Sequence, residues 1–397
     1  MKVLHLTTWK EICGIATYTS NLIKSLEEQH IYNEVYPINR EKLQYLSLNE
    51  IRNYLVGVCN VANDFDVVHI QHEHGFFHGS YFSEKSIDIF AEILVNLKNK
   101  NKKVVVTFHT EPIFVQPIYR MFKDGKNKFS ENVYNSIQTL KWKTKIATIF
   151  NSSKDVFTAV VHTKKSRLSF INSGFNPDSI RIIKHGVSQR NTNYLGLSKS
   201  DCKAKLNLNI NSKLLSIFGF VSKYKGYEIA LNALKYLPNK YNLAIIGGSH
   251  PNDKEGKTME ELLKLIIELD LRDRVLITGF VEFEVLDLFH GATDICLAPY
   301  LSSTLSASGA LTWAFNSGKP IIATKIPAFE EINQEYNCML MVSPECPVEL
   351  SLGILNLDKN EQLQQELVKN SLSYAYENSW DKISRIYLDL YNELSSN

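Results

Sequence analysis

Two kinds of hydrophobic segment alternate along the first half of the chain: segments with apolar residues at helical spacing, and short continuous apolar runs. Residues 14–28 carry apolar side chains three to four positions apart, which predicts a helix, and a second helix is expected near residues 83–99. Short apolar runs, typical of buried strands, lie before, between and after these helices. The runs are Val3–Thr7, Asp66–Gln71, Lys103–His109, Phe157–His162 and Arg181–Lys184.

The second half of the chain repeats this alternation after a break. Residues 188–200 are polar and lack periodicity, so we interpret them as a linker between two domains. The strands predicted beyond this linker, with helices between most of them, are Leu214–Phe218, Leu243–Ile246, Val275–Thr278, Ile295–Ala298, Pro320–Ala323 and Met339–Met341. Alternating strands and helices in two halves predict an α/β fold with two doubly wound, Rossmann-like parallel sheets.

Two segments of the second half read as a strand, a loop with glycine and a helix. They are residues 216–226, SIFGFVSKYKG, and residues 306–324, SASGALTWAFNSGKPIIAT. Free N–H groups at a helix N-terminus bind phosphate well, and Lys225 adds a positive charge. The pair of segments therefore predicts a nucleotide diphosphate at the carboxyl ends of a parallel sheet.

Composition and charge are those of a globular enzyme. At about 150 residues per domain, 397 residues indicate two or three domains, and a net charge of +2 is too small to indicate nucleic-acid binding. The six cysteines form no CxxC pair, so neither a zinc site nor a disulfide framework is indicated. The start, MKVLHLTTW, is typical of a first strand rather than a signal peptide, and no run of eighteen apolar residues occurs. We therefore expect a cytoplasmic protein.

The order of motifs resembles the GT-B-fold retaining glycosyltransferases of the family-four, or group 1, type over nearly the whole chain. The motifs are CGIATYT, VVHIQHEHG, VVVTFHTEP, IIKHGV, FGFVSKYKG, LAIIGG, LITGFV and SGKPIIAT. The resemblance implies a GT-B fold with an acceptor-side domain over 1–190 and a nucleotide-sugar domain over 200–378, facing across a cleft. The segment ENSWDKISRIYLDLY resembles the last helix of the family, so residues 380–397 are expected to pack back on the first domain.

The same resemblance implies an activity and a set of roles. The enzyme would transfer a sugar, with retention and without a metal or other cofactor, from a UDP- or GDP-linked donor to a glycan, glycolipid or other hydroxyl acceptor. Lys225 matches the lysine of the phosphate clamp, and His109 matches a histidine that positions the donor sugar by a hydrogen bond. The remaining matched donor-binding residues are Gly14, Gly219, Val281, Ser308, Gly309 and Ala310.

Several positions depart from the family pattern. Phe220 stands where the family has an arginine, and Lys223 is expected to supply the second charge. Leu305 and Trp313 stand where it has paired glutamates, so Ser306, Ser308 or Thr312 could serve instead. These losses keep a second function open, a catalytically silent GT-B subunit that stabilises a partner glycosyltransferase. A GT-B epimerase or phosphorylase stays open as well, although no convincing carboxylate pair or cofactor-lysine motif is found.

Other features of the first half have two interpretations each. His72 and His74 are read as hydrogen-bonding groups on the acceptor side or as structural residues, since a metal site lacks a third well-spaced ligand. The basic region 98–167 would suit an anionic membrane surface or a lipid-phosphate-linked acceptor, or is a solvated helix face. Peripheral contact with the inner membrane face is therefore possible for this protein. The polar tract 123–132 is expected to be a loop over the acceptor cleft.

Overall fold

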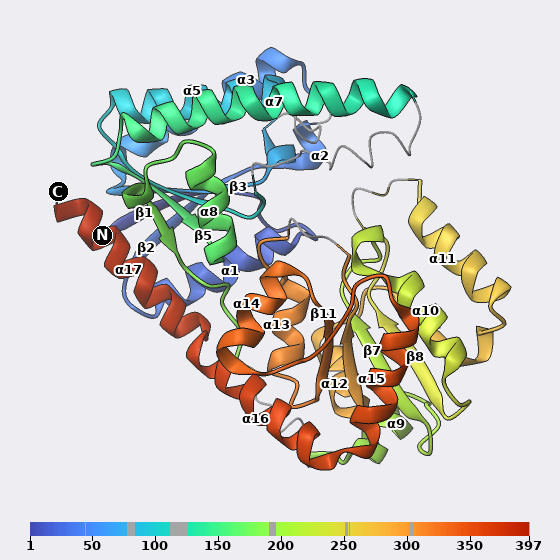
Figure 1. Cartoon of the computed structure of the whole chain (residues 1–397). Helices are drawn as coiled ribbons and strands as arrows, with labels where there is room; N and C mark the ends of the chain where they lie inside the picture. Colours follow the sequence, from blue (N-terminus) through green and yellow to red (C-terminus); the bar gives the residue numbers. More distant parts are fainter. Residues whose placement is uncertain are drawn as a thin grey trace. The chain divides into compact units, whose positions relative to one another are not determined.

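The chain folds into two compact units (Figure 1). The structure is a computed structural model, and it describes residues 1–43, 45–77, 84–111, 126–189, 196–250, 253, 255–301 and 305–396. The N-terminal unit comprises Met1–His185, Thr304–Ala307 and Trp380–Asn397, and the C-terminal unit comprises Gly186–Ser303 and Ser308–Ser379. The division falls just before the polar stretch that the sequence marked as a linker, and residues 190–195 of that stretch lie outside the described residues.

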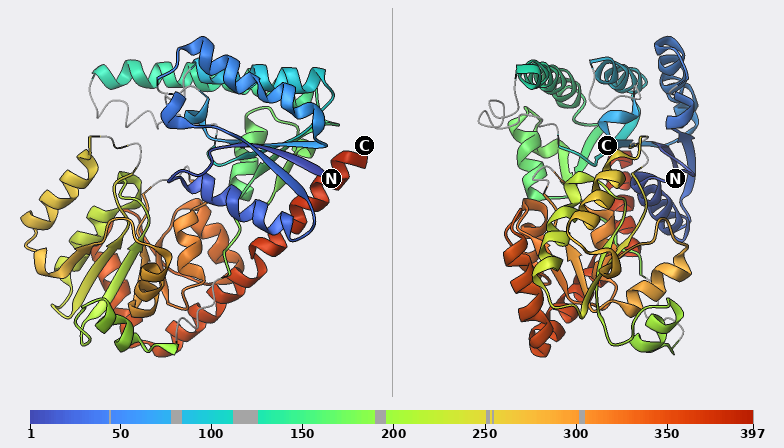
Figure 2. Two further views of the ribbon diagram at one scale, coloured as in Figure 1. Left: turned by 180° about the vertical axis from the view of Figure 1, so that it is seen from behind. Right: turned by 90° about the vertical axis from the view of Figure 1, so that its right-hand side faces the viewer.

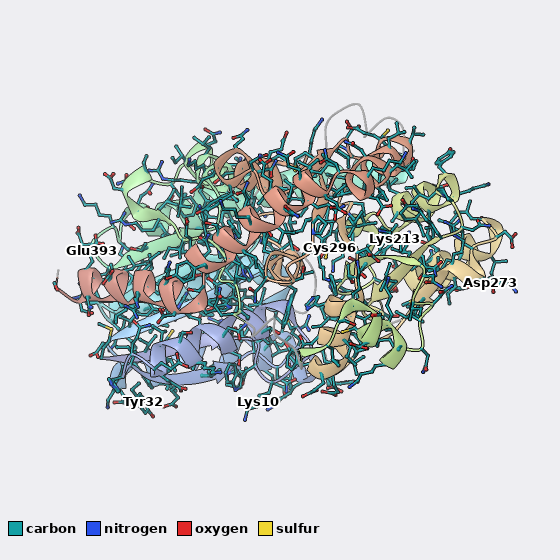
Figure 3. All side chains as sticks on the ribbon, turned by 90° about the horizontal axis from the view of Figure 1, so that it is seen from below. Lys10, Tyr32, Lys213, Asp273, Cys296 and Glu393 are labelled. Carbon is teal, nitrogen blue, oxygen red and sulfur yellow. The ribbon has the colours of Figure 1, made fainter. Side chains whose placement is uncertain are left out.

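Within the described residues, the N-terminal unit is built on a parallel six-stranded sheet in the order β2-β1-β3-β4-β5-β6. The strands are β1 (Lys2–Thr7), β2 (Tyr32–Pro37), β3 (Val67–His72), β4 (Lys103–Phe108), β5 (Phe157–Val161) and β6 (Ile180–Ile182). The sequence predicted all of these except β2. That strand lies at the edge of the sheet, and Tyr32 at its start is 55% exposed (Figure 3).

Both faces of this sheet are covered by helices, because successive side chains of a strand point to opposite faces. Leu4, Val68 and Val104 belong to one core with α3, α5 and α7, whereas Val3, Val67 and Val105 belong to another with α1 and α17 (Figure 2). The helices of the unit are α1 (Gly14–Glu27), α2 (Arg40–Leu43), α3 (Leu48–Val56), α4 (Val58–Val61), α5 (Glu84–Asn99), α7 (Lys126–Asn151), α8 (Lys164–Asn172) and α17 (Trp380–Ser396).

Helix α7 corrects one expectation from the sequence. The polar tract 123–132 was expected to be a loop, but its residues 126–132 form the first two turns of α7, and 123–125 lie outside the described residues. The buried residues Trp142, Ile146, Ala147 and Phe150 recur at helical spacing further along the same helix. The anchoring of α7 by this later stretch explains why its polar start continues as helix.

The C-terminal unit carries, in its described part, a second parallel six-stranded sheet, in the order β12-β11-β10-β7-β8-β9. All six strands were predicted to within two residues at each end. They are β7 (Lys213–Phe218), β8 (Tyr241–Ile246), β9 (Val275–Ile277), β10 (Ile295–Ala298), β11 (Ile321–Thr324) and β12 (Leu340–Val342). The helices are α9 (Lys199–Lys205), α10 (Tyr227–Tyr236), α11 (Lys257–Glu268), α12 (Phe283–Ala292), α13 (Gly309–Phe315), α14 (Pro327–Tyr336), α15 (Pro347–Lys359) and α16 (Glu361–Glu377).

The strand orders fix where each unit can bind a ligand. In a doubly wound sheet, ligands bind beyond the carboxyl ends of the strands, at the point where the strand order reverses direction. That point lies between β1 and β3 in the N-terminal unit and between β7 and β10 in the C-terminal unit. The predicted fold class, with two doubly wound parallel sheets, is thus confirmed, and it places a candidate site in each unit.

Helix α17 completes the N-terminal unit from the far end of the sequence. Its residues Ile383, Tyr387 and Leu390 are buried in the same core as Val3 and Leu22. The hydroxyl groups of Tyr18 and Tyr387 are 2.8 Å apart, which joins α1 to α17 by a buried hydrogen bond. Across the described residues, no helix is both long enough and apolar enough to cross a membrane.

Candidate active site

The reversal point of the C-terminal sheet is formed by the loops after β7 and β10. Strand β7 ends at Phe218, and a short 3-10 turn over Lys223–Lys225 brings the chain back toward it. Lys225 is only 3% exposed, and its Nζ lies 3.4 Å from the Phe218 carbonyl oxygen and 5.9 Å from the centre of the Tyr300 ring. Gly219 makes room for this ammonium group, because a Cβ there would lie 2.3 Å from Lys225 Nζ. The φ of +99° at Gly219 also suits glycine.

The start of α13 lies beside the same loop after β7. Ser308 caps α13 by accepting a hydrogen bond from the Leu311 N–H at 3.2 Å, and its Oγ lies 3.1 Å from the Tyr300 hydroxyl. A Cβ at Gly219 would lie 3.1 Å from the Cβ of Ala310. We call the group that these contacts join the Lys225 cluster, and its members are Gly219, Lys225, Tyr300, Ser308 and Ala310. Four of these residues are predicted from the sequence. Tyr300 is not, and its position at the end of the strand run ICLAPY was the available signal.

Burial gives Lys225 an unusual charge state. It lowers the pKa of the Lys225 ammonium group from 10.5 to about 7, because the charged form loses its hydration. Its one hydrogen bond to a described residue is the long contact to the Phe218 carbonyl oxygen. A buried cation held this way would be stabilised by an anion placed beside it.

The other predicted donor residues of this unit lie in different settings. Lys223 is engaged at the surface, where its Nζ lies 2.7 Å from Glu261 Oε2 and its side chain is 68% exposed. Val281 lies half-buried in the loop between β9 and α12. Thr312 donates its hydroxyl proton to the Gly309 carbonyl of its own helix at 2.6 Å. The roles of these three residues in donor binding stay predictions.

The structure also shows what occupies the positions where the family motif differs. Phe220, in place of the arginine, packs against Phe280 and His250 with ring centres 5.5 and 5.3 Å apart. Trp313 stacks on Phe283 with ring centres 5.9 Å apart. Leu305 belongs to the N-terminal unit, where it forms a β-bridge with Thr110. Aromatic packing thus replaces the charged groups at positions 220 and 313.

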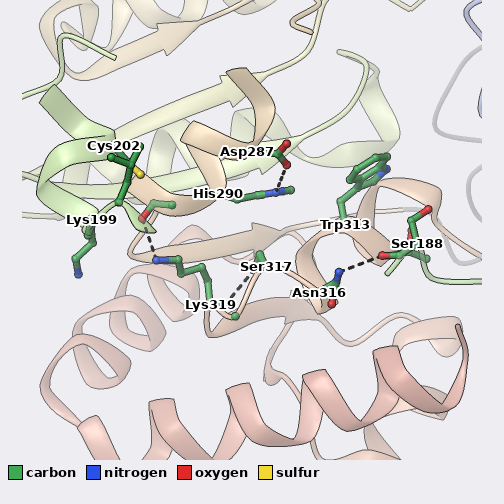
Figure 4. A pocket seen from close by; sticks show the side chains of 13 residues that line it. Ser188, Lys199, Cys202, Asp287, His290, Trp313, Asn316, Ser317 and Lys319 are labelled. Atoms are coloured by element: carbon green, nitrogen blue, oxygen red, sulfur yellow. Dashed lines mark hydrogen bonds and ion pairs between the residues drawn. The ribbon is translucent and has the colours of Figure 1, made fainter. Parts of the chain in front are cut away.

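A cavity of about 220 Å³ lies elsewhere in the C-terminal unit (Figure 4). It shares Thr312 and Trp313 with the segment 306–324, but its lining does not include Lys225 or Ser308. Its cations are already engaged, since Lys319 Nζ donates to the Gly291 carbonyl at 3.0 Å and Lys199 pairs with Asp294 at 2.6 Å.

The reversal point of the N-terminal sheet holds His109, directly after β4. Its Nε2 lies 2.8 Å from Gln71 Oε1 on β3, and its ring meets the edge of Tyr18 with centres 5.0 Å apart. Ser306 donates its hydroxyl proton to the His109 carbonyl, so two predicted site residues meet in this unit. Gly14 begins α1 after β1, and a Cβ there would have no atom within 4 Å.

The electrostatics of His109 favour a neutral ring. Burial, with the neighbouring His162 and His185 as smaller causes, lowers the pKa of His109 well below 6.5. A neutral imidazole with a low pKa is a weak base but a good hydrogen-bonding group. This fits a positioning role better than proton abstraction.

His72 and His74 lie buried in the N-terminal unit. They are 2% and 3% exposed, and the His72 ring packs among Phe77, Phe90 and Phe108. This burial agrees with a structural role, and hydrogen bonding to an acceptor by either ring stays a prediction. In the described part of the chain, no three His, Cys, Asp or Glu side chains gather as a metal site would require. Beside these histidines, burial raises the pKa of the Glu73 carboxyl group to about 7.

Part of the basic region makes local contacts. Lys98 donates to Ser152 Oγ at 2.7 Å, Lys102 donates to two backbone carbonyls, and Lys145 pairs with Asp88. Residues 112–125 of this region lie outside the described residues. The described contacts agree with a solvated helix face, and contact with a membrane stays a prediction.

Comparison with known proteins shows which family the C-terminal unit resembles. Residues 198–373, just under half of the chain, match the family Glycosyl transferases group 1. An uncharacterized glycosyltransferase of Methanocaldococcus jannaschii is 21% identical over 249 residues, 62% of this chain and 59% of its own length. The D-inositol 3-phosphate glycosyltransferase of Xylanimonas cellulosilytica is 24% identical over 196 residues, 49% of this chain and 45% of its own length.

Among solved structures, Anabaena HepE has a similar fold. It matches with a TM-score of 0.71 at 17% identity, over 100% of both chains, and has been solved with UDP and with UDP-glucose. At this identity the likeness shows the fold alone, whereas the family match rests on the sequence of the C-terminal unit. Residues 198–373 of the C-terminal unit thus match the Glycosyl transferases group 1 family, and the fold of the chain is the GT-B fold.

Proposed function

We propose that this protein is a retaining glycosyltransferase that moves a sugar from a nucleoside diphosphate to a hydroxyl acceptor without a metal ion. The observation that carries the proposal is the buried, poorly solvated ammonium group of Lys225 at the reversal point of the C-terminal sheet. A UDP-linked donor is the first candidate, because the similar fold of HepE has been solved with UDP-glucose. A GDP-linked donor is the second.

In this proposal the Lys225 cluster binds the diphosphate. The bond between the anomeric carbon and the phosphate oxygen breaks, and negative charge develops on the departing phosphate. A positive charge and backbone N–H groups fixed before the reaction stabilise that charge strongly in a site that excludes water. Lys225 supplies the charge, and the N–H groups of Ser308, Gly309 and Ala310 supply the donors. The bond to the acceptor oxygen forms on the same face of the sugar, and the acceptor proton passes to the departing phosphate oxygen.

His109 would act on the sugar rather than on the phosphates. Its neutral ring can form one hydrogen bond to a sugar hydroxyl, which holds the anomeric carbon in a reactive position. The acceptor would be a glycan, a glycolipid or another hydroxyl compound, as in polysaccharide biosynthesis. A lipid-linked acceptor would agree with the basic region 98–167 lying at a membrane surface.

The decisive experiment measures nucleoside diphosphate release from a panel of UDP- and GDP-sugars, together with UDP affinity by calorimetry. Lys225→Ala should weaken UDP binding by roughly 10- to 150-fold, the equivalent of one lost charge-assisted hydrogen bond. Lys235→Ala, which removes an exposed lysine of α10, is the matched control and should bind UDP like the wild type. Binding of UDP that is unaffected by Lys225→Ala would refute the assignment of the diphosphate site.

A silent GT-B subunit is the competing function, because Leu305 and Trp313 replace two carboxylates with apolar side chains. A silent subunit predicts that the pure protein neither transfers sugar nor hydrolyses any donor of the panel. His109→Ala separates the two functions further. In an active enzyme it should lower turnover by about 10- to 1000-fold with little change in UDP affinity. The anomeric configuration of the product, read by NMR, then tests retention.

A further inference from the structure

We propose that Gln71 and Tyr391 are positioning residues that fix the tautomer and orientation of His109 through a buried hydrogen-bond relay. The relay runs from the tail helix α17 through His69 and Gln71 to the ring of His109. The inference rests on the proposed function for its catalytic meaning, because it takes His109 as the group that contacts the donor sugar.

The first step of the relay joins His109 to Gln71. His109 Nε2 lies 2.8 Å from Gln71 Oε1. An amide oxygen only accepts, so Nε2 of the neutral ring carries the proton and donates. Nδ1 of His109 is then the unprotonated nitrogen, which can accept a hydrogen bond from a hydroxyl group.

The second step joins Gln71 to His69 on the same strand. The Gln71 amide nitrogen lies 3.2 Å from His69 Nε2 and can only donate, so this nitrogen of His69 is unprotonated. His69 Nδ1 must then carry the proton, and it lies 2.6 Å from the hydroxyl oxygen of Tyr391 on α17. Tyr391 thus accepts a hydrogen bond from His69 Nδ1–H, which favours the tautomer to which Gln71 can donate.

A second branch supports the same assignment. The Thr107 hydroxyl lies 2.8 Å from His69 Nε2, and the hydroxyl of Tyr387 lies 2.9 Å from Thr107. Tyr387 in turn lies 2.8 Å from the Tyr18 hydroxyl. One direction of donation agrees with these contacts: Tyr18 donates to Tyr387, Tyr387 to Thr107, and Thr107 to His69. The single lone pair of His69 Nε2 is then shared between Thr107 and the longer contact from Gln71. Two residues of α17 therefore act on the same ring.

Because the relay is buried, each of its hydrogen bonds needs a correctly oriented donor and acceptor. His69, Gln71 and Thr107 are completely buried, and Tyr387 and Tyr391 are buried as well. Water cannot replace a lost partner at these positions, so a wrong donor or acceptor would leave an unpaired polar group. Burial also lowers the pKa of His69 well below its usual value, which keeps the ring neutral with a single proton to place.

Other groups around His109 constrain its ring less. Tyr18 packs against it edge-on, and the rings of His162 and His109 are 5.4 Å apart. His162 Nδ1 is engaged with the Ile183 carbonyl at 2.8 Å, and His185 acts on His109 as one of the smaller causes of its lowered pKa. Gln71 is therefore the side chain that the structure pairs with His109 by a direct hydrogen bond.

The test uses the full chain labelled with ¹⁵N-histidine, because the ¹⁵N shifts distinguish protonated from unprotonated ring nitrogens. Wild-type His109 should be in the Nε2–H form and His69 in the Nδ1–H form. Gln71→Leu should convert His109 to a mixture of tautomers, and Tyr391→Phe should alter both rings. Tyr36→Phe is the matched control, since it also removes a phenol hydrogen bond of this unit, to the Tyr54 carbonyl, outside the relay.

Gln71→Glu gives the sharpest signature. A carboxylate at this position still accepts a hydrogen bond from His109 Nε2–H, so His109 should keep its tautomer. The pKa of His109 should rise, because the negative charge stabilises the protonated ring. A residue that only packs would not produce this change. We expect Gln71→Leu to lower kcat by about 100-fold with little change in KM, and Gln71→Glu to restore part of that loss.

The two kinds of readout separate the relay from the proposed function. An Nδ1–H form of His109 in the wild type, or tautomers unchanged in Gln71→Leu, would overturn the relay whatever the activity. A wild type without any transfer or hydrolysis would instead overturn the proposed function, while the NMR result would still decide the relay. Equal losses of kcat in Gln71→Leu and Gln71→Glu, with the His109 pKa unmoved, would reduce Gln71 to a packing residue and refute its positioning role.

Discussion

Replacing Lys225 with methionine should stabilise the ligand-free protein at neutral and acidic pH. Burial lowers the pKa of Lys225 to about 7, against 10.5 for an ordinary lysine. Between these two values the unfolded chain binds more protons than the folded one, so stability rises with pH across this window. Below about pH 7 both states carry the proton, and the folded state bears the full cost of the buried charge.

The size of the effect follows from the same two values. Each unit of difference in pKa corresponds to about 1.4 kcal/mol, so the full cost below pH 7 is on the order of 5 kcal/mol. Lys225 is 3% exposed, which leaves little screening by water to reduce this cost. Methionine has a similar length and no charge. Lys225→Met should therefore be more stable than the wild type by several kcal/mol at pH 6, and the advantage should shrink steadily toward pH 9.

Urea unfolding at pH 6, 7, 8 and 9 measures this difference, with Lys235→Met as the control for removal of an exposed lysine from the same unit. The control should differ little from the wild type at any pH. A Lys225→Met variant that is less stable than the wild type by the same amount at every pH would refute the reasoning. Lys225 would then stabilise the fold through its packing, and its charge would not be strained.

The strained charge should also be visible when the ligand binds. At pH 8 a lysine with a pKa of about 7 is about nine-tenths neutral, and a bound diphosphate would restore its proton. UDP binding at pH 8 should then take up close to one proton, measured by calorimetry in buffers of different ionisation enthalpy. Lys225→Met should abolish that uptake. Wild-type binding without proton uptake would contradict a diphosphate at this lysine.

Two further substitutions test the packing of each unit. Gly219→Ala places a Cβ 2.3 Å from Lys225 Nζ at a φ of +99°, so we expect a loss of about 1–3 kcal/mol in stability and weaker UDP binding. Thermal shifts with and without UDP measure both effects, and an unchanged shift would show that Lys225 is not held against Gly219. Trp380→Ala removes a side chain that is 6% exposed and lies edge-on to Tyr18 with ring centres 4.8 Å apart. Urea unfolding should show a loss of about 3–5 kcal/mol, and a loss no larger than that of the exposed Tyr376→Ala would contradict the docking of α17.

The spacing of hydrophobic residues was sufficient to predict those strands that are buried on both faces of a sheet. Strands such as β3 and β4 are rich in valine and isoleucine and buried along nearly their whole length, because helices cover both sides. The same criterion missed β2, whose sequence YNEVYP alternates at the edge of the sheet and exposes part of its side chains. It also missed α7, whose polar first turns continue into a helix that is anchored further on.

The Lys225 cluster was largely predictable because all of its members except Tyr300 are a glycine or lie next to a glycine in the sequence. The hydrogen-bond relay to His109 could not be predicted from the sequence. Gln71 faces Thr107 only through the register of β3 and β4, and Tyr391 is 322 residues away from the histidine that it contacts. Such contacts depend on the pairing of strands and on the docking of a distant helix. Neither can be inferred from the local spacing of hydrophobic residues.

The return of α17 to the N-terminal unit has a consequence for synthesis. A chain emerges from the ribosome with its N-terminal residues first. The face of the first sheet that carries Val3, Val67 and Val105 is covered in part by residues 380–396, which are made about two hundred residues after the sheet itself is complete. Throughout that interval the nascent chain exposes apolar surface, a binding site for chaperones and a hazard for aggregation. The folding of this unit is therefore coupled to translation of the whole second half, and a stalled or truncated chain would leave it unfinished.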